Sequence, residues 1–201
     1  MNALPNDTLA RLEARLDQIE DRQKVYEVLA RYCRALDRCD LELMKTVYWE
    51  DGIDDHGVFS GNAQEFARFI IHEIQQWFEL TMHAICNVLI ELDGDTARAE
   101  SYLISYCQVK ADRERIEGVF GPRYLQQFVG AGEPTPQDFL YGGRYVDRLE
   151  KRNGTWRIAR RTVVMDWNRN EPSRDILDEG MFKALALRGT RDRTDAVYTA
   201  K

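Results

Sequence analysis

The chain has 201 residues, 44% hydrophobic and 31% charged, which is the composition of an ordinary folded domain. Its 28 basic and 34 acidic side chains give a net charge of −6, which argues against nucleic-acid binding, because such proteins neutralise phosphates with an excess of Lys and Arg. No apolar run approaches the roughly 20 residues of a membrane span, and the first 25 residues are too charged for a secretory signal. We therefore expect a cytoplasmic protein that binds neither nucleic acid nor membrane.

The first part of the chain predicts helices. Apolar residues at spacings of three and four predict one amphipathic helix over residues 8–20 and a second that ends near Arg38. A short third helix follows Asp40 and a longer fourth follows Asn62, because both residues can cap a helix N-terminus. Between these two helices, Ile53 to Phe59 predicts a short strand.

The second part predicts two β-hairpins. Alternating side chains run from residue 82 to 92 and from 96 to 109, on either side of an Asp-Gly-Asp turn. Residues 139–151 and 155–167 flank Asn153-Gly154, and Asn-Gly between alternating segments is a strong hairpin signal.

Helices followed by long antiparallel strands indicate the α+β class, with a strongly curved, mostly antiparallel sheet wrapped around the N-terminal helices as a cone-shaped barrel. Residues 1–20 are predicted to form a helical extension and 21–170 one α+β barrel domain. Residues 171–201 form a C-terminal excursion with one helix around Ile176 to Leu187. The connection 111–138 is longer than most, and such links are usually functional or disordered.

Two residues could form a general base. His83 shares a predicted strand face with Ile85, Asn87 and Leu89, and a half-buried histidine beside a carboxylate can accept a proton from carbon. Asp37 lies at the predicted helix end and could supply that carboxylate. Each residue also fits a structural role, His83 as a core histidine and Asp37 as a solvated side chain.

Tyr32 and Arg144 could complete such a site. Tyr32 precedes Asp37 by five positions, about 140° on an ideal helix, so both face one cavity only if the helix ends or bends near Asp37. Arg144 follows Gly142-Gly143, which would let a ligand or a bulky side chain approach the backbone. Inside the sheet this arginine would bind a leaving anion or an enolate oxygen, whereas outside it would be a surface charge.

Metal and cofactor sites have little support. Asp54, Asp55 and His56 could join His83 in a non-haem iron site, but the spacing is unspecific, and His56 is better interpreted as a pocket wall or surface residue. The four cysteines form no C-x-x-C pair and are interpreted as reduced thiols. No glycine-rich loop precedes a helix, so we expect neither metal nor cofactor.

Three segments together resemble a known family: the helix string Tyr32-Cys33-Arg34-Ala35-Leu36-Asp37-Arg38-Cys39-Asp40, the strand entry Thr81-Met82-His83, and the hairpin containing Gly143-Arg144-Tyr145 and Asn153-Gly154-Thr155-Trp156. They resemble the SnoaL-like branch of the nuclear-transport-factor-two-like superfamily, especially its bile acid dehydratase-like, scytalone dehydratase-like and dehydrochlorinase-like members. The resemblance covers roughly residues 18–168. It implies a cone-shaped α+β barrel, assembled as a homo-oligomeric dimer or trimer, that acts on a small-molecule substrate.

The resemblance further implies a dehydratase-type lyase that removes water from a small ring-containing or polyketide-like hydroxy substrate without cofactor or metal. By position, His83 resembles the general base, Asp37 its orienting partner, Tyr32 a hydrogen-bond donor to the substrate, and Arg144 the residue near the leaving group or the substrate oxygen. The candidate substrate-binding side chains are those that could line an aromatic pocket, namely His56, Trp49, Tyr106 and Trp167.

Three alternatives remain open from the sequence. The chain could be a non-catalytic structural subunit resembling an aromatic-ring dioxygenase β subunit. It could be a polyketide cyclase or isomerase that uses Asp37 as its base, or a ligand-binding protein without catalysis.

Overall fold

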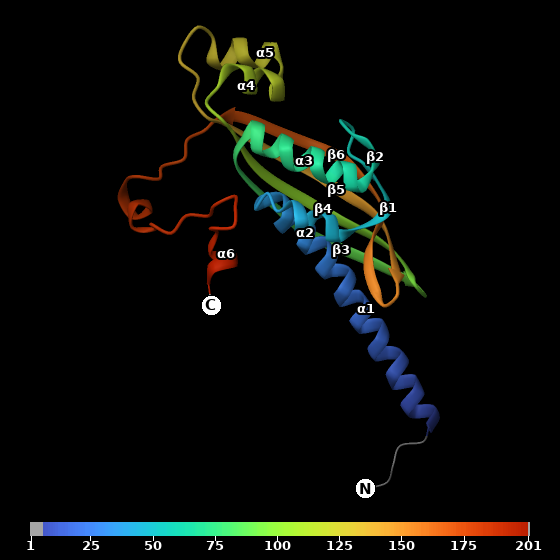
Figure 1. Cartoon of the computed structure of the whole chain (residues 1–201). Coiled ribbons are helices and arrows are strands. Elements are labelled where there is room, and N and C mark those ends of the chain that lie inside the picture. The colour runs from blue at the N-terminus through green and yellow to red at the C-terminus, as the bar shows by residue number, and fades with distance from the viewer. Residues whose placement is uncertain (1–5, 201) are drawn as a thin grey trace.

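The computed structural model describes residues 6–200 as helices and one six-stranded sheet (Figure 1). The helical segments are α1 (Asn6–Asp37), α2 (Leu41–Val47), α3 (Ala63–Trp77), α4 (Arg113–Phe120), α5 (Pro122–Tyr124), the π-helix η1 (Leu125–Val129), the 3-10 helix η2 (Gly180–Ala184) and α6 (Ala196–Thr199). The strands are β1 (Tyr48–Asp55), β2 (Ser60–Asn62), β3 (Phe78–Asp93), β4 (Thr96–Val109), β5 (Gln137–Arg152) and β6 (Thr155–Pro172). The predicted α+β class is confirmed.

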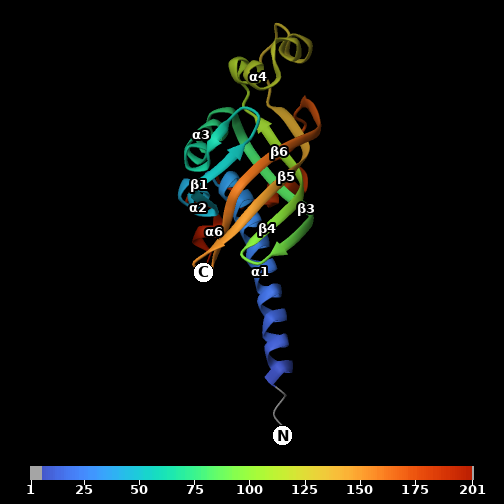
Figure 2. The same cartoon turned by 90° about the vertical axis from the view of Figure 1, so that its right-hand side faces the viewer.

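The sheet has the order β2-β1-β6-β5-β4-β3 and is antiparallel except where β1 runs parallel to β6. It is not closed, since β2 and β3 form its two edges. The long strands β3 to β6 twist across α1, as expected of strands of this length (Figure 2). We call the face against the helices the inner face and the opposite one the outer face.

Helix α1 is one helix where the sequence predicted two. No Gly or Pro interrupts residues 6–37, and Asp21, at the expected break, does not cap a new helix. Its carboxylate instead accepts hydrogen bonds from Trp156 Nε1 at 2.8 Å and Lys151 Nζ at 3.0 Å. The half of α1 before Asp21 extends away from the sheet, and its apolar side chains Leu9, Leu12, Leu16 and Ile19 are exposed (Figure 1).

The predicted helix starts are confirmed by their caps. Asp40 accepts a hydrogen bond from the Leu43 amide at the start of α2, and Asn62 accepts from the Gln64 and Glu65 amides at the start of α3. The strand predicted from Ile53 to Phe59 is misplaced, because β1 begins at Tyr48 and the chain turns back after Asp55 into β2.

Both hairpins are confirmed. In the β5–β6 turn, Asn153 and Gly154 have φ values of 52° and 76°, the left-handed pair that a type I′ turn requires. In the β3–β4 turn Gly94 has φ 56°. The connection 111–138 forms α4, α5 and η1.

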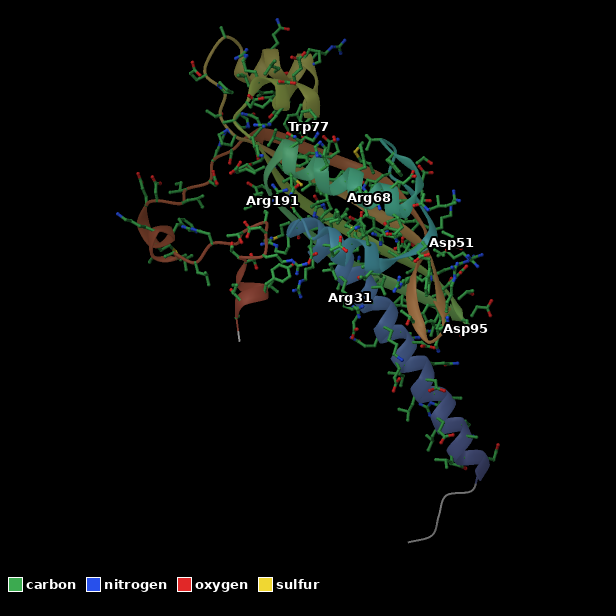
Figure 3. All side chains as sticks on the ribbon, viewed as in Figure 1. Arg31, Asp51, Arg68, Trp77, Asp95 and Arg191 are labelled. Carbon is green, nitrogen blue, oxygen red and sulfur yellow. The ribbon has the colours of Figure 1, made fainter. Side chains whose placement is uncertain are left out.

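The C-terminal segment differs from its prediction. In place of a helix over Ile176 to Leu187 it forms only η2, and its apolar side chains there are exposed, so no packing surface stabilises a longer helix. Beyond η2 the chain returns to the body. Arg191 donates to the carbonyls of Ile74 and Phe78 (Figure 3), and Asp195 pairs with Arg38 at 2.6 Å.

The core lies between α1 to α3 and the inner face. None of the helices in residues 6–200 is long and apolar enough to cross a membrane.

The Asn62 cap should stabilise α3 measurably. We expect Asn62→Ala to lower the free energy of unfolding by about 1 kcal/mol, because two amides of the first turn lose their acceptor. Urea denaturation measures this difference. The control Gln76→Ala, at an exposed position of the same helix, should change it by less than about 0.5 kcal/mol. Equal effects of the two substitutions would contradict the capping role.

Candidate active site

The end of α1 fixes the position of Asp37. Cys39 has φ 49°, and the amides of Cys39 and Asp40 donate to the carbonyls of Leu36 and Ala35. This is a Schellman arrangement, which ends a helix sharply with a left-handed residue. Asp37 is therefore the last helical residue, and its side chain reaches toward β3.

Asp37 and His83 form the predicted pair. His83 Nδ1 lies 2.6 Å from Asp37 Oδ1, and the His83 backbone amide donates to Asp37 Oδ2 at 2.9 Å. Both carboxylate oxygens are engaged by the same residue, so the imidazole is held in one orientation. The two side chains are 13% and 10% exposed, so solvent reaches the pair. Among residues 6–200 no group hydrogen-bonds His83 Nε2.

A bulge in β3 determines which residues share the face of His83. His83 and Ile85 face inward, opposite Ser105 and Leu103, but Asn87 has φ 30° and is skipped in the pairing with β4. Side chains beyond the bulge change parity, so Val88 faces inward and Leu89 is exposed. The expectation that Asn87 and Leu89 share the face of His83 is therefore wrong.

A second histidine-carboxylate pair lies at the end of β1. His56 Nδ1 is 3.0 Å from Asp54 Oδ1, while Asp54 Oδ2 accepts a hydrogen bond of 2.5 Å from the Tyr48 hydroxyl. Burial, reinforced by the Asp54 charge, raises the pKa of Tyr48 well above its ordinary value, so the hydroxyl keeps its proton. His56 stacks on Phe66 at 4.8 Å between ring centroids.

A buried ion pair crosses the middle of the inner face. Arg161 on β6 donates from Nε and Nη2 to the two oxygens of Asp147 on β5, each at 2.7 Å, and both side chains are fully buried. The guanidinium lies between the rings of Tyr32 and Tyr145, 3.9 Å and 4.0 Å from their centroids. Burial alone lowers the pKa of Arg161, but the Asp147 carboxylate raises it well above its ordinary value.

Tyr32 belongs to this cluster. Its side chain is fully buried, and its hydroxyl has no hydrogen-bond partner within the described chain. Burial and the nearby Asp54 charge raise the pKa of Tyr32, although Arg161 opposes the shift. The hydroxyl thus remains a proton donor inside the fold.

Arg144 is not part of this site. It lies on the outer face and pairs with Asp166 through Nε at 2.9 Å and Nη2 at 3.0 Å, and with Glu100 at 3.1 Å. Its inward neighbour Tyr145 contacts Tyr32 instead. The strand parity that places Tyr145 inside excludes Arg144 from the interior, which corrects its predicted role.

The three candidate aromatic residues also lie elsewhere. Trp49 donates to the Glu150 carbonyl and lies under Arg152 and Arg157. Tyr106 and Trp167 are on the outer face, where the Tyr106 hydroxyl donates to Asp138 and the Trp167 ring covers Gly142. A Cβ on Gly142 would lie 2.1 Å from that ring, so the glycine admits a bulky side chain, as predicted, and not a ligand. Of the four predicted substrate-binding residues, only His56 faces the interior.

Sequence reasoning did not single out Arg161 and Asp147. Asp147 points to the same side of its strand as the buried residues Tyr145 and Leu149. A carboxylate on the apolar side of a strand could have indicated a buried polar partner. Arg161 carried no such signal, because the pairing of β6 with β5 shifts between Ile158 and Arg160. Ile158 and Arg161 therefore both face inward although they are three positions apart.

The remaining titratable groups suggest no other chemistry. Within residues 6–200 no three His, Cys, Asp or Glu side chains are grouped to hold a metal ion, so the iron-site alternative lacks geometric support. All four cysteines are free, and burial raises the pKa of Cys33 and of Cys107 to about 12, which makes both poor nucleophiles at neutral pH.

The model of the SnoaL-like domain family matches residues 17–162. The chain therefore belongs to this family, in agreement with the resemblance seen in its helix string and hairpins. No curated protein sequence matches the chain.

Several solved structures share the fold. One, from Novosphingobium aromaticivorans, is named "putative scytalone dehydratase"; it is 17% identical, with a TM-score of 0.60 over 78% of this chain and 91% of that one. Another from the same organism is named "putative aromatic ring hydroxylase"; it is 18% identical, with a TM-score of 0.59 over 77% of this chain and 94% of that one. The hexachlorocyclohexane dehydrochlorinase LinA-type3 from Novosphingobium barchaimii is 15% identical, with a TM-score of 0.62 over 80% of this chain and 95% of that one. At these identities the likeness establishes the fold alone.

The buried ion pair should make single substitutions costly. We expect Arg161→Leu and Asp147→Asn each to lower the free energy of unfolding by about 3–5 kcal/mol, because each leaves one charge buried without its partner. The double variant Arg161→Leu/Asp147→Leu should lose less than either single variant. Urea denaturation measures all three, and Arg144→Ala, which breaks an exposed pair, serves as a control with an expected loss below about 1 kcal/mol. Wild-type stability of Arg161→Leu would refute this account.

Proposed function

We propose that the protein is a cofactor-independent lyase that eliminates water from a small, ring-containing hydroxy substrate. The observation that supports this most directly is the 2.6 Å contact between His83 Nδ1 and Asp37 Oδ1, together with the lack of a hydrogen-bond partner for Nε2 within residues 6–200. Elimination begins with removal of a proton from carbon, and a neutral imidazole nitrogen is a suitable base for that step.

Asp37 sets the proton arrangement of this base. Because the carboxylate accepts a hydrogen bond, Nδ1 carries the ring proton and Nε2 presents its lone pair. When Nε2 takes the substrate proton, the ring becomes a cation next to the Asp37 charge, which stabilises it. Both Asp37 oxygens are occupied by His83, which disfavours the alternative cyclase or isomerase with Asp37 itself as the base.

Two hydrogen-bond donors at the centre of the inner face could stabilise an oxygen that gains negative charge during the reaction. In the described part of the chain, Tyr32 Oη and Arg161 Nη1 are buried without partners. A carbonyl next to the acidic carbon becomes an enolate in the transition state, and preorganised donors stabilise that charge. In this proposal Tyr32 and Arg161 take the part that Arg144 was predicted to play.

The walls of the interior favour a compact ring as the substrate. Partly buried apolar side chains pack against the core, including Phe59, Phe69, Ile85, Tyr141 and Val163. Binding sites for small organic ligands combine such walls with few polar groups.

Substitution of the dyad tests the proposal. With 3-hydroxycyclohexanone as the probe, formation of cyclohex-2-enone can be followed by its ultraviolet absorbance. We expect His83→Gln to lower turnover by about 10²- to 10⁴-fold, the usual contribution of a general base, and Asp37→Asn to lower it substantially. His72→Gln, at an exposed position on α3, is the matched control and should leave turnover unchanged. Full turnover by both His83→Gln and Asp37→Asn would refute the proposed lyase.

We also propose that a second copy of the chain covers the outer face. Large apolar side chains on this face are between 44% and 61% exposed, namely Met82, Leu89, Tyr102, Ile104, Val146 and Trp167. Monomeric proteins rarely expose extended apolar patches, which favours the expected homo-oligomer.

A charge at the middle of this face should separate the copies. We expect sedimentation velocity at micromolar concentration to show a dimer or trimer for the wild type and a monomer for Ile104→Lys, because a charge would be buried in the interface. Val58→Lys, at an exposed turn between β1 and β2, is the control and should sediment as the wild type does. A monomeric wild type would exclude this assembly.

A further inference from the structure

The interior contains two histidine-carboxylate pairs of the same kind. In each pair an Asp oxygen contacts Nδ1 of the imidazole, at 2.6 Å for His83 and 3.0 Å for His56. In each pair Nε2 has no hydrogen-bond partner in residues 6–200. The proposed base uses only the His83 pair, so the His56 pair has no assigned role.

The two pairs belong to the same side of the sheet. Asp54 is level with Arg161 in the β1–β6 pairing, and Arg161 is level with Asp147 in the β5–β6 pairing. All three side chains are buried against the inner face, which also carries His83. The carboxylate of the His56 pair thus lies in one row with Arg161 and Asp147 across the inner face.

Aromatic contacts connect His56 with the end of α1. The His56 ring stacks on Phe66, Phe66 contacts Tyr48 at 6.4 Å, and Tyr48 contacts Tyr32 at 6.1 Å between ring centroids. Tyr32 lies on the same helix as Asp37, about a turn and a half before it. These contacts connect His56, through Phe66 and Tyr48, to the ring of Tyr32, whose hydroxyl has no hydrogen-bond partner within residues 6–200.

The carboxylate that contacts His56 is more deeply buried than the imidazole itself. Asp54 is fully buried, whereas the His56 side chain is 19% exposed. The Tyr48 hydroxyl and His56 together occupy both Asp54 oxygens. A protonated His56 would donate from Nδ1 to Asp54 and carry its second N–H at Nε2, directed away from the carboxylate.

We propose that His56 is a second catalytic residue, the general acid that donates a proton from Nε2 to the departing hydroxyl group. This inference rests on the proposed lyase function and assigns the second half of its reaction.

The complete step is balanced. The C–H electron pair forms the new C=C bond as His83 Nε2 takes the proton, and the C–O bond breaks with its electron pair on oxygen. His56 Nε2 gives that oxygen a proton, so water leaves. His83 ends protonated and His56 neutral, and exchange with solvent restores both. A halide in place of the hydroxyl group leaves as a stable anion and needs no proton from His56.

This difference gives the test. 3-Hydroxycyclohexanone and 3-chlorocyclohexanone both yield cyclohex-2-enone, so one absorbance assay follows both reactions. We expect His56→Gln to lower turnover of the hydroxy compound by about 10²-fold or more, and that of the chloro compound by less than about threefold. His83→Gln should lower both, because both reactions begin with proton removal. Asp54→Asn, which keeps the side-chain shape, should reproduce the selective loss.

A binding measurement covers the case in which a variant fails to fold. The chain has only three histidines, and exposed His72 serves as an internal control. In NMR spectra of the wild type, phenol as a planar probe should shift the imidazole signals of His56 and His83 and leave that of His72 in place. A His56 signal that does not move would overturn the proposal, because His56 would then not face the ligand.

The outcomes separate the two claims. Equal losses on the two compounds, or no loss on either, in folded His56→Gln would overturn the acid role while leaving the lyase intact. A wild type that converts neither compound would overturn the lyase for this substrate class, and the acid role with it.

Discussion

The buried pairing of Arg161 with Asp147 is the interaction on which the interior depends. Two full charges in the core are tolerated only because both carboxylate oxygens are used and two tyrosine rings enclose the guanidinium. One of these rings, Tyr32, belongs to α1 and the other to β5. The pair therefore connects the helix to the sheet, and this contact helps to place the end of α1, with Asp37, over β3.

Irregularities in the strands decide which side chains face this interior. The bulge at Asn87 lets His83 and Val88 share the inner face, and the shift beside Ile158 brings Arg161 inside. With regular alternation, His83 and Val88 would lie on opposite faces, and so would Ile158 and Arg161. The chemistry of the inner face thus depends on a few extra residues in the strands.

The two faces of the sheet divide the functions that we propose. The inner face carries the histidines, their carboxylates, and the Tyr32 and Arg161 donors that have no partner within residues 6–200, while the outer face carries exposed apolar side chains and the Arg144 ion pairs. One sheet would thus combine the proposed reaction on its inner face with the proposed assembly surface on its outer face. His56 and His83 would then act from two sides on one small ring.

The sequence by itself determined the α+β class, several helix starts, the two hairpins and the most specific pair of the candidate site. Helix caps and turn residues act locally, so Asp40, Asn62 and Asn153-Gly154 were identified correctly, and the family resemblance brought Asp37 and His83 together across 46 positions. Only the tertiary structure decided that Arg144, Tyr106 and Trp167 lie outside and that Arg161 lies inside. The physical reason is that side-chain orientation in a strand depends on register, and register depends on bulges and partner strands that local patterns do not encode.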